Sequence, residues 1–115
     1  MKLVTGLSTN PNQLFRVPLD DGSIVKLTIK YKSRPGAWFL DVEYKSFTLR
    51  GKKLFNSLNV LRQYKNIIPF GLNVVCPEGT EPILINDFSS GRCTLNVLTA
   101  SEVEELESAY KDANA

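Results

Sequence analysis

The stretch SIVKLTIKYKSRPGAWFLDVEY, residues 23–44, carries two runs of alternating apolar and polar residues with one turn between them. The apolar positions are Val25, Leu27, Ile29 and Tyr31 before the turn, and Trp38, Leu40, Val42 and Tyr44 after it. Because successive side chains of a strand point to opposite faces, this period of two predicts an antiparallel hairpin with one buried face. Residues 33–36 are predicted to form a type II turn, in which Pro35 fixes φ and Gly36 takes a positive φ.

The buried face of this hairpin is predicted to form a core around Trp38. The other core members are Leu27, Ile29, Leu40 and Val42. An indole that alternates with aliphatic residues belongs to a core rather than to an exposed stacking surface, and its burial removes roughly 150–250 Å² from water. On the opposite face, we expect cross-strand ion pairs between three lysines and two acidic residues: Lys26, Lys30, Lys32, Asp41 and Glu43.

The rest of the chain predicts a mainly β fold, a small antiparallel β-barrel or sandwich, with a C-terminal α-helix. Further strands are expected at residues 13–17, 47–49, 59–62, 72–76, 82–85 and 92–98. The helix is expected at about residues 101–111, because Ser101 and Glu104 match a capping box. With 115 residues, the chain is expected to form a single domain, residues 1–115, whose β core covers about residues 11–98.

Charge divides the chain into two parts. Residues 1–65 contain 12 basic and four acidic residues, a formal charge of +8, whereas residues 66–115 contain two basic and eight acidic residues, a charge of −6. Such a division predicts surfaces that meet partners of opposite charge, or that meet each other.

The composition predicts no metal site, no cofactor and no membrane span. Cys76 and Cys93 lie in apolar stretches and are expected to be buried, reduced thiols, with a disulfide as the alternative if they lie opposite each other on paired strands. Two cysteines without any histidine are too few ligands for a zinc site of the usual kind. No apolar run approaches the roughly 18 residues that cross a bilayer, and no secretory signal is recognisable at the N-terminus, so the cytoplasm is the expected site of synthesis and assembly.

Catalysis is not expected. The absence of histidine excludes a Ser-His-Asp or Cys-His arrangement, and the sequence has no phosphate-binding glycine loop. Asp41 and Glu43 lie two apart on a strand and so share a face, where a glycosidase-like acid pair is conceivable. An ion-pair ladder with the neighbouring lysines is the preferred interpretation, so the sequence predicts a protein that is not an enzyme.

Nucleic-acid binding is the strongest alternative function. Eight basic residues could form one surface on a small β-barrel: Lys26, Lys30, Lys32, Arg34, Lys45, Arg50, Lys52 and Lys53. Oligonucleotide-binding barrels also place aromatic residues among the basic ones, but here Phe39 alone in the hairpin faces that side. A solvated face or a protein-contact surface is therefore preferred.

The sequence also resembles a known family. Its hairpin and the strand before it are similar to the small baseplate plug proteins of contractile-tailed phages, of the cyanophage type, at Gln13, Phe15, Tyr31, Arg34, Gly36, Trp38 and Asp41. Weaker matches continue to about residue 97, at Gly51, Leu54, the stretch IIPFGL, Glu81-Pro82, Gly91-Arg92 and Leu95.

The resemblance implies a structural virion protein of the tail baseplate, which closes the lumen of the distal tail tube and hub until the genome passes. Hub and tail tube proteins would be its partners, with the tape-measure protein and a second copy of the chain as further candidates, and nucleic acid would be met only transiently. We expect the basic residues Arg34, Lys45, Arg50, Lys52 and Lys53 to face acidic partner surfaces, and Glu102, Glu104, Glu105 and Glu107 to face basic ones. Two of the arginines have alternatives within the fold: Arg34 with Asp41 or Glu43, and Arg92 with Glu81 or Asp87.

Overall fold

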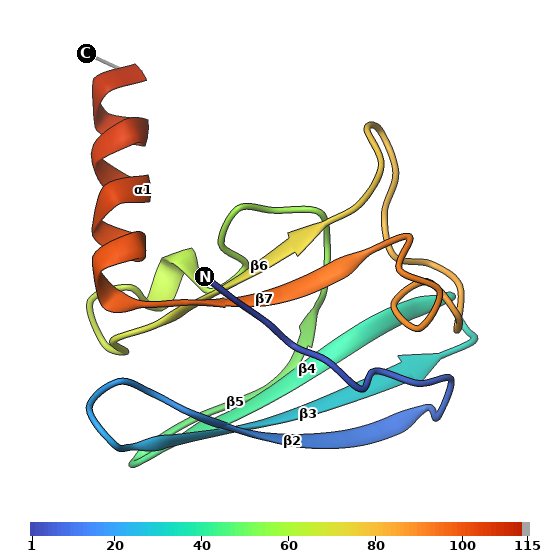
Figure 1. The fold of residues 1–115 in the computed structure, drawn as a ribbon. Helices are drawn as coiled ribbons and strands as arrows, with labels where there is room; N and C mark the ends of the chain where they lie inside the picture. Colours follow the sequence, from blue (N-terminus) through green and yellow to red (C-terminus); the bar gives the residue numbers. More distant parts are fainter. Residues whose placement is uncertain (114–115) are drawn as a thin grey trace.

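The computed structural model describes residues 1–113 as two antiparallel sheets and one C-terminal helix. Figure 1 shows the four-stranded sheet as the lower layer, the three-stranded sheet above it, and the helix rising from the upper layer. The predicted mainly β fold with a C-terminal helix is confirmed. The two sheets do not close into a barrel, so the layered arrangement is the correct one of the two that the sequence predicts.

The four-stranded sheet is a meander in which each strand pairs with the next one along the chain. Its strands are β2 (Asn12–Pro18), β3 (Ile24–Lys32), β4 (Ala37–Tyr44) and β5 (Phe47–Lys53). The predicted hairpin is β3 and β4, with Tyr31 opposite Trp38 and Ile29 opposite Leu40. Because this register puts the apolar residues of both strands on one side, the sheet has one apolar and one charged face.

The turn between β3 and β4 differs from the predicted type II turn. The Arg34–Pro35 peptide bond is cis, which the tertiary amide of proline permits, and the Gly36 N–H donates to the Lys32 carbonyl at 2.9 Å across one residue more than in a β-turn. The expected positive φ at Gly36 is present, at 85°.

The three-stranded sheet joins the two ends of the chain. Its order is β1 (Lys2–Leu3), β7 (Thr94–Leu98) and β6 (Gly71–Val75), with β7 in the centre. Lys2 lies opposite Val97 on one side of β7, and Leu72 lies opposite Val97 on the other. The first residues therefore complete a sheet whose other strands come from the second half of the chain.

The core lies between the two sheets, and Trp38 is at its centre. All five residues predicted for it are 0 % exposed: Leu27, Ile29, Trp38, Leu40 and Val42. The Trp38 ring packs against Tyr31, with 5.1 Å between centroids, and edge-on against Phe88 at 5.7 Å. Cys76 and Cys93 are buried and free, so the expected reduced thiols are observed and the alternative disulfide is not.

Two predicted strands are wrong. Residues 59–62 lead into a short 3₁₀ helix, η1 (Arg62–Tyr64), because the Asn59 side-chain oxygen accepts the amides of Leu61 and Leu72 and turns the chain there. Residues 82–85 belong to a long loop between β6 and β7, and side chains rather than a neighbouring strand bind their backbone groups.

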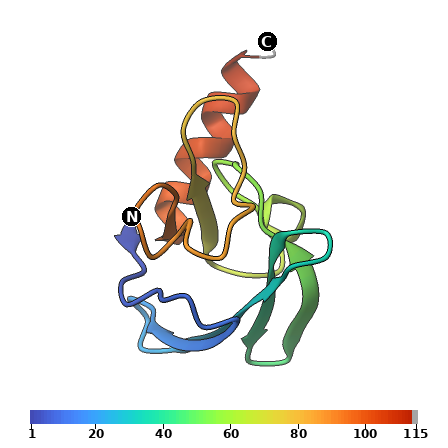
Figure 2. The ribbon, with the colours of Figure 1, turned by 90° about the vertical axis from the view of Figure 1, so that its right-hand side faces the viewer.

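The helix α1 (Ala100–Ala113) follows β7 directly and projects away from the two sheets (Figures 1 and 2). Val103 is buried against the body, whereas Leu106 and Tyr110 are half-buried. No helix among the described residues combines the length and the apolar character that a membrane span requires.

Candidate functional site

The outer face of the four-stranded sheet carries a set of basic side chains, here called the basic face: Arg16, Lys26, Lys30, Lys32, Arg50 and Lys53. These residues alternate with the buried ones, so the strand period brings them together on one surface. Phe39 is the aromatic residue of the hairpin on this side, and the Lys32 ammonium lies 5.1 Å from its ring centre. The basic face therefore lacks the series of open aromatic rings on which single-stranded nucleic acid stacks.

Asp41 and Glu43 lie within the basic face and are paired there. The Lys30 ammonium is 2.9 Å from Asp41, and the Lys26 ammonium is 3.6 Å from Glu43, as the sequence predicts. Arg50 contacts both carboxylates, at 3.7 Å from Asp41 and 3.3 Å from Glu43. Burial alone would raise the pKa of Asp41, but the hydrogen bond from Lys30 and the Gly51 amide at 2.8 Å together hold it below its ordinary value. The two acids thus act as counter-ions of the basic face.

The basic residues predicted to contact partners do not form one patch. Arg50 and Lys53 lie on the basic face, whereas Lys52 lies on the other side of β5, with its ammonium 5.6 Å from the Phe55 ring centre. Arg34 and Lys45 lie in the turns before and after β4, so the length of that strand separates them.

The predicted ion pair between Arg34 and Asp41 or Glu43 is absent among residues 1–113. Arg50 takes the position instead, because β5 pairs directly beside β4 and brings Arg50 onto the face that carries both carboxylates.

Two of the four glutamates predicted to contact partners form ion pairs within the fold instead. Glu107 accepts a bidentate pair from Arg62, at 2.8 and 3.0 Å, and Lys65 lies 3.8 Å away. Glu102 pairs with the N-terminal ammonium of Met1 at 2.5 Å. The hydrogen bonds from these partners lower the pKa of both carboxyls. The remaining two, Glu104 and Glu105, are exposed on α1.

The predicted capping box is displaced by two residues. Thr99 caps the helix: its hydroxyl accepts the Glu102 amide at 3.2 Å, and the Glu102 carboxylate accepts the Thr99 amide at 3.0 Å. The pattern of serine or threonine followed three residues later by glutamate occurs twice here. The end of β7 at Leu98 selects the first of the two.

A pair of alanine variants tests which of the two possible capping boxes caps the helix. We expect Thr99→Ala to lower the free energy of unfolding by about 1 kcal/mol, because it removes a bond from an N-cap side chain. Ser101→Ala, at the exposed second helical residue, should change it by less than about 0.5 kcal/mol. Urea unfolding monitored by circular dichroism measures both values, and a larger loss in Ser101→Ala would contradict the observed cap.

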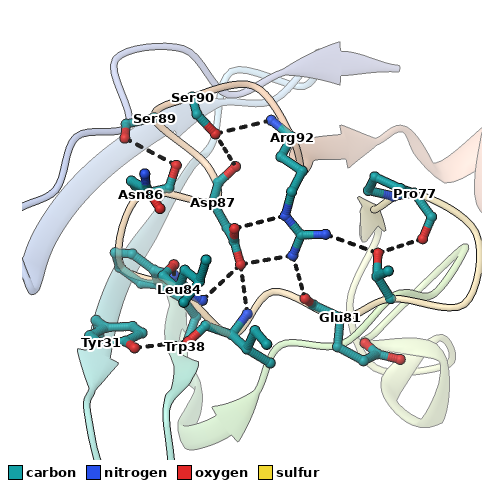
Figure 3. Close-up of polar contacts among 12 residues, drawn as sticks. Tyr31, Trp38, Pro77, Glu81, Leu84, Asn86, Asp87, Ser89, Ser90 and Arg92 are labelled. Atoms are coloured by element: carbon teal, nitrogen blue, oxygen red, sulfur yellow. Dashed lines mark hydrogen bonds and ion pairs between the residues drawn. The ribbon is translucent and has the colours of Figure 1, made fainter.

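The loop between β6 and β7 is held by Asp87 and Arg92, as Figure 3 shows. The guanidinium of Arg92 donates to both carboxylate oxygens of Asp87, at 2.8 and 2.9 Å, and also to the Thr80 hydroxyl and the Glu81 carbonyl. The predicted pairing of Arg92 with Asp87 is therefore present. The pair to Arg92 lowers the pKa of Asp87 to about 2, although the carboxylate is almost completely buried.

The same cluster fixes the apolar segment 82–85. One Asp87 oxygen accepts the amides of Ile83 and Leu84, at 2.7 and 2.8 Å. The carbonyls of Ile83 and Leu84 accept the Tyr31 hydroxyl at 2.8 Å and the Trp38 indole N–H at 3.0 Å (Figure 3). The sequence does signal the ion pair, but not these long-range contacts to the hairpin.

Reactive groups are scarce in this structure. Burial raises the pKa of the Cys76 thiol to about 12 and also raises that of Cys93, so both stay protonated at neutral pH and are poor nucleophiles. Among residues 1–113, no three Cys, Asp or Glu side chains are grouped so that they could hold a metal ion. The notable features of the described residues are the basic face, the exposed glutamates of α1 and the apolar segment 82–85 fixed by Asp87.

Comparison with protein families decides between the possible contact roles. The family model described as cyanophage baseplate Pam3 plug gp18 matches residues 3–100. This chain belongs to the cyanophage baseplate plug family. A baseplate plug is a structural protein of the phage virion, so the protein is a tail component that associates with other baseplate components. The match covers both sheets and ends where α1 begins. No curated protein matches the chain.

Proposed function

We propose that the protein closes the lumen of the distal tail tube at the baseplate hub, and that it leaves or rearranges before the genome passes. The family match over residues 3–100 carries this proposal, because it covers the whole two-sheet body. The plug assembles with the baseplate in the host cytoplasm, and residues 1–115 act in it as one domain. As the plug family is structural, its work is adhesion and obstruction rather than catalysis.

The distribution of charge supports a plug that is held firmly but released. The basic face and the exposed acids Glu104 and Glu105 point to partners of opposite charge on different sides of the body. Exposed ion pairs contribute only about 0–1 kcal/mol each, so many together can hold a subunit that a conformational change of the hub still releases. Acidic surfaces of hub or tube proteins would meet the basic face, and a basic surface or the terminus of the tape-measure protein would meet α1.

A map of the intact tail tip tests this proposal most directly. We expect density for this chain on the tail axis at the distal end of the tube, and loss of that density in particles made without the protein. Those particles should lose DNA from filled heads more readily than wild-type ones. A chain found only on the outer surface of the baseplate would refute the proposal.

Charge reversal tests the role of the basic residues in docking. We expect Lys52→Glu/Lys53→Glu chains to enter baseplates less often than wild type, because acidic partner surfaces would then repel them. The neutral pair Lys52→Gln/Lys53→Gln is the matched control and should fall between the two. Incorporation is measured by mass spectrometry of purified particles, together with the thermal unfolding of each variant. Equal incorporation of all three folded chains would rule out docking through these lysines.

A further inference from the structure

Two strand edges on the same side of the molecule have no partner strand. The edges belong to β1 and β2, the outermost strands of the two sheets, which lie near each other in Figure 2. Between them run two adjoining hollows of about 240 and 210 Å³. Both are lined by Lys2, Val17, Pro18 and Val97, and together they form what is here called the edge groove.

The register shows which backbone groups of β2 lie on its free edge, where Arg16 lines the edge groove and Leu14 continues the same edge beyond it. The Tyr31 amide donates to the Pro11 carbonyl and the Leu19 amide to the Ser23 carbonyl, so the odd-numbered residues of β2 are the ones bonded to β3. In an antiparallel pair these alternate with residues whose groups point outward. The amides of Leu14 and Arg16 therefore point away from β3, and no described residue accepts a hydrogen bond from them.

The same reasoning applies to β1. The Val4 amide donates to the Leu95 carbonyl, so the backbone groups of Leu3, one residue earlier, point away from β7. Unpaired amides and carbonyls along a strand are the groups that an added strand binds. Pro18 has no N–H and ends the usable edge of β2, which leaves room for an extended segment of about five residues.

The side chains around the edge groove limit what this segment can be. Its walls are apolar at Phe15, Val17 and Val97. Arg16 carries positive charge at one end and Asp20 and Asp21 carry negative charge at the other, while Lys2 lines both hollows. Among residues 1–113, Lys2, Arg16 and Asp20 form no ion pair. A strand with an acidic residue at one end, apolar residues in the middle and a basic residue at the other end is complementary to this lining.

We infer that the edge groove binds an extended segment of another baseplate protein, which adds to β2 as a further strand and lies beside β1. The inference rests on the proposed function for its partner, since a baseplate neighbour must supply the strand. Backbone hydrogen bonds would provide the affinity, and the divided charge of the groove would set the direction of the segment. In this arrangement the plug is anchored by one strand along its edge, which adjoins the basic face at Arg16.

Proline substitution tests the edge of β2 without breaking the sheet. Leu14→Pro removes an outward-facing N–H and leaves the bonds to β3 in place, because proline is tolerated where a strand edge is free. Leu14→Ala is the matched control, since it shortens the same exposed side chain and keeps the amide. Cells infected with phage that lack the gene would express wild type together with one variant. In purified particles we expect Leu14→Pro to be about five- to ten-fold less abundant than Leu14→Ala, the effect of one lost hydrogen bond.

Hydrogen exchange provides a second measurement that does not depend on a variant. The Leu14 and Arg16 amides should exchange rapidly in the isolated protein and slowly in purified baseplates, whereas the Phe15 amide, bonded to β3, should be slow in both. A photocrosslinker at position 14 should attach to another baseplate protein. Fast exchange in baseplates that contain the protein, or equal incorporation of both Leu14 variants, would overturn the inference and leave the proposed function standing. A crosslink to a second copy would overturn the choice of partner, and absence of the wild-type chain from baseplates would refute the proposed function itself.

Discussion

Trp38→Ala lowers the free energy of unfolding by about 3–5 kcal/mol, the expected cost of deleting a fully buried aromatic side chain. Three contacts are lost together: the rings of Tyr31 and Phe88, and the hydrogen bond from the indole to the Leu84 carbonyl. Because a domain of this size is stable by only about 5–15 kcal/mol, the variant should lose a large share of its stability and unfold at a clearly lower denaturant concentration. Chemical unfolding monitored by far-UV circular dichroism measures the loss.

Two further variants separate packing from hydrogen bonding. Trp38→Phe keeps an aromatic ring but removes one of the two hydrogen bonds to the Leu84 carbonyl, which still accepts the Asp87 amide at 3.1 Å, so the loss should be about 0.5–1.5 kcal/mol. Phe39→Ala removes the neighbouring aromatic residue on the outer face, and we expect a clearly smaller loss because that ring is only half-buried. If Phe39→Ala were as damaging as Trp38→Ala, the position of the core between the two sheets would be wrong.

Replacing Asp87 by asparagine is expected to produce the second large effect, a loss of about 3 kcal/mol at pH 7. Among residues 1–113, the buried carboxylate is the only charged partner of Arg92 and the shared acceptor of the Ile83 and Leu84 amides. Asparagine therefore weakens several charge-assisted hydrogen bonds at once, while Arg92 keeps its bonds to Thr80 and Glu81. Glu78→Gln, in the same loop but exposed, is the matched control and should be nearly neutral. Denaturant unfolding at pH 7 gives both values.

The pH dependence of the Asp87 effect has a definite sign. The folded-state pKa of Asp87, about 2, lies below the ordinary aspartate value of 3.8, so the folded state favours the ionised form. Its contribution is complete above about pH 4 and disappears as the pH falls towards 2, by about 2 kcal/mol in total. The difference between wild type and Asp87→Asn should therefore narrow over that interval. A difference that stays constant from pH 7 to pH 2 would show that the carboxylate is not held by Arg92.

The local sequence pattern was sufficient to predict the elements whose backbone hydrogen bonds join segments that are close in sequence. The alternation in residues 23–44 predicts β3 and β4 because both strands pair across one short turn and their buried face is continuous. The pairing of Arg92 with Asp87 is also local, since the two residues lie five apart in the same loop. The family resemblance, which depends on the same hairpin, is confirmed by the match over residues 3–100.

Prediction from the sequence was wrong where side chains from distant parts of the chain form the hydrogen bonds with the backbone. Residues 82–85 are apolar enough for a strand, but Asp87, Trp38 and Tyr31 bind the backbone groups that a strand would offer to its neighbour. The choice between the two capping boxes likewise depended on where β7 ends, which is a property of the sheet.

The candidate contact surfaces could also be predicted only in part from the sequence. Alternation along one strand predicts a shared face, and it identifies Lys26 and Lys30 as partners of the acids on β4. It misplaced Lys52 and Lys53 because the strand was expected only at residues 47–49, whereas β5 runs to Lys53 and puts these two consecutive residues on opposite sides. The edge groove could not be predicted either, because β1 takes its place beside β2 only by pairing with the distant strand β7.

The pairing of β1 with β7 has a consequence for the order in which the protein acquires its shape. The meander from β2 to β5 uses contacts between successive strands and can form while later residues are still on the ribosome. Lys2, by contrast, must wait for Val97 before it has a strand to join. One wall of the edge groove therefore forms only after β7 is available, so a newly made chain can bind an added strand only once residue 97 has been made and has paired with Lys2.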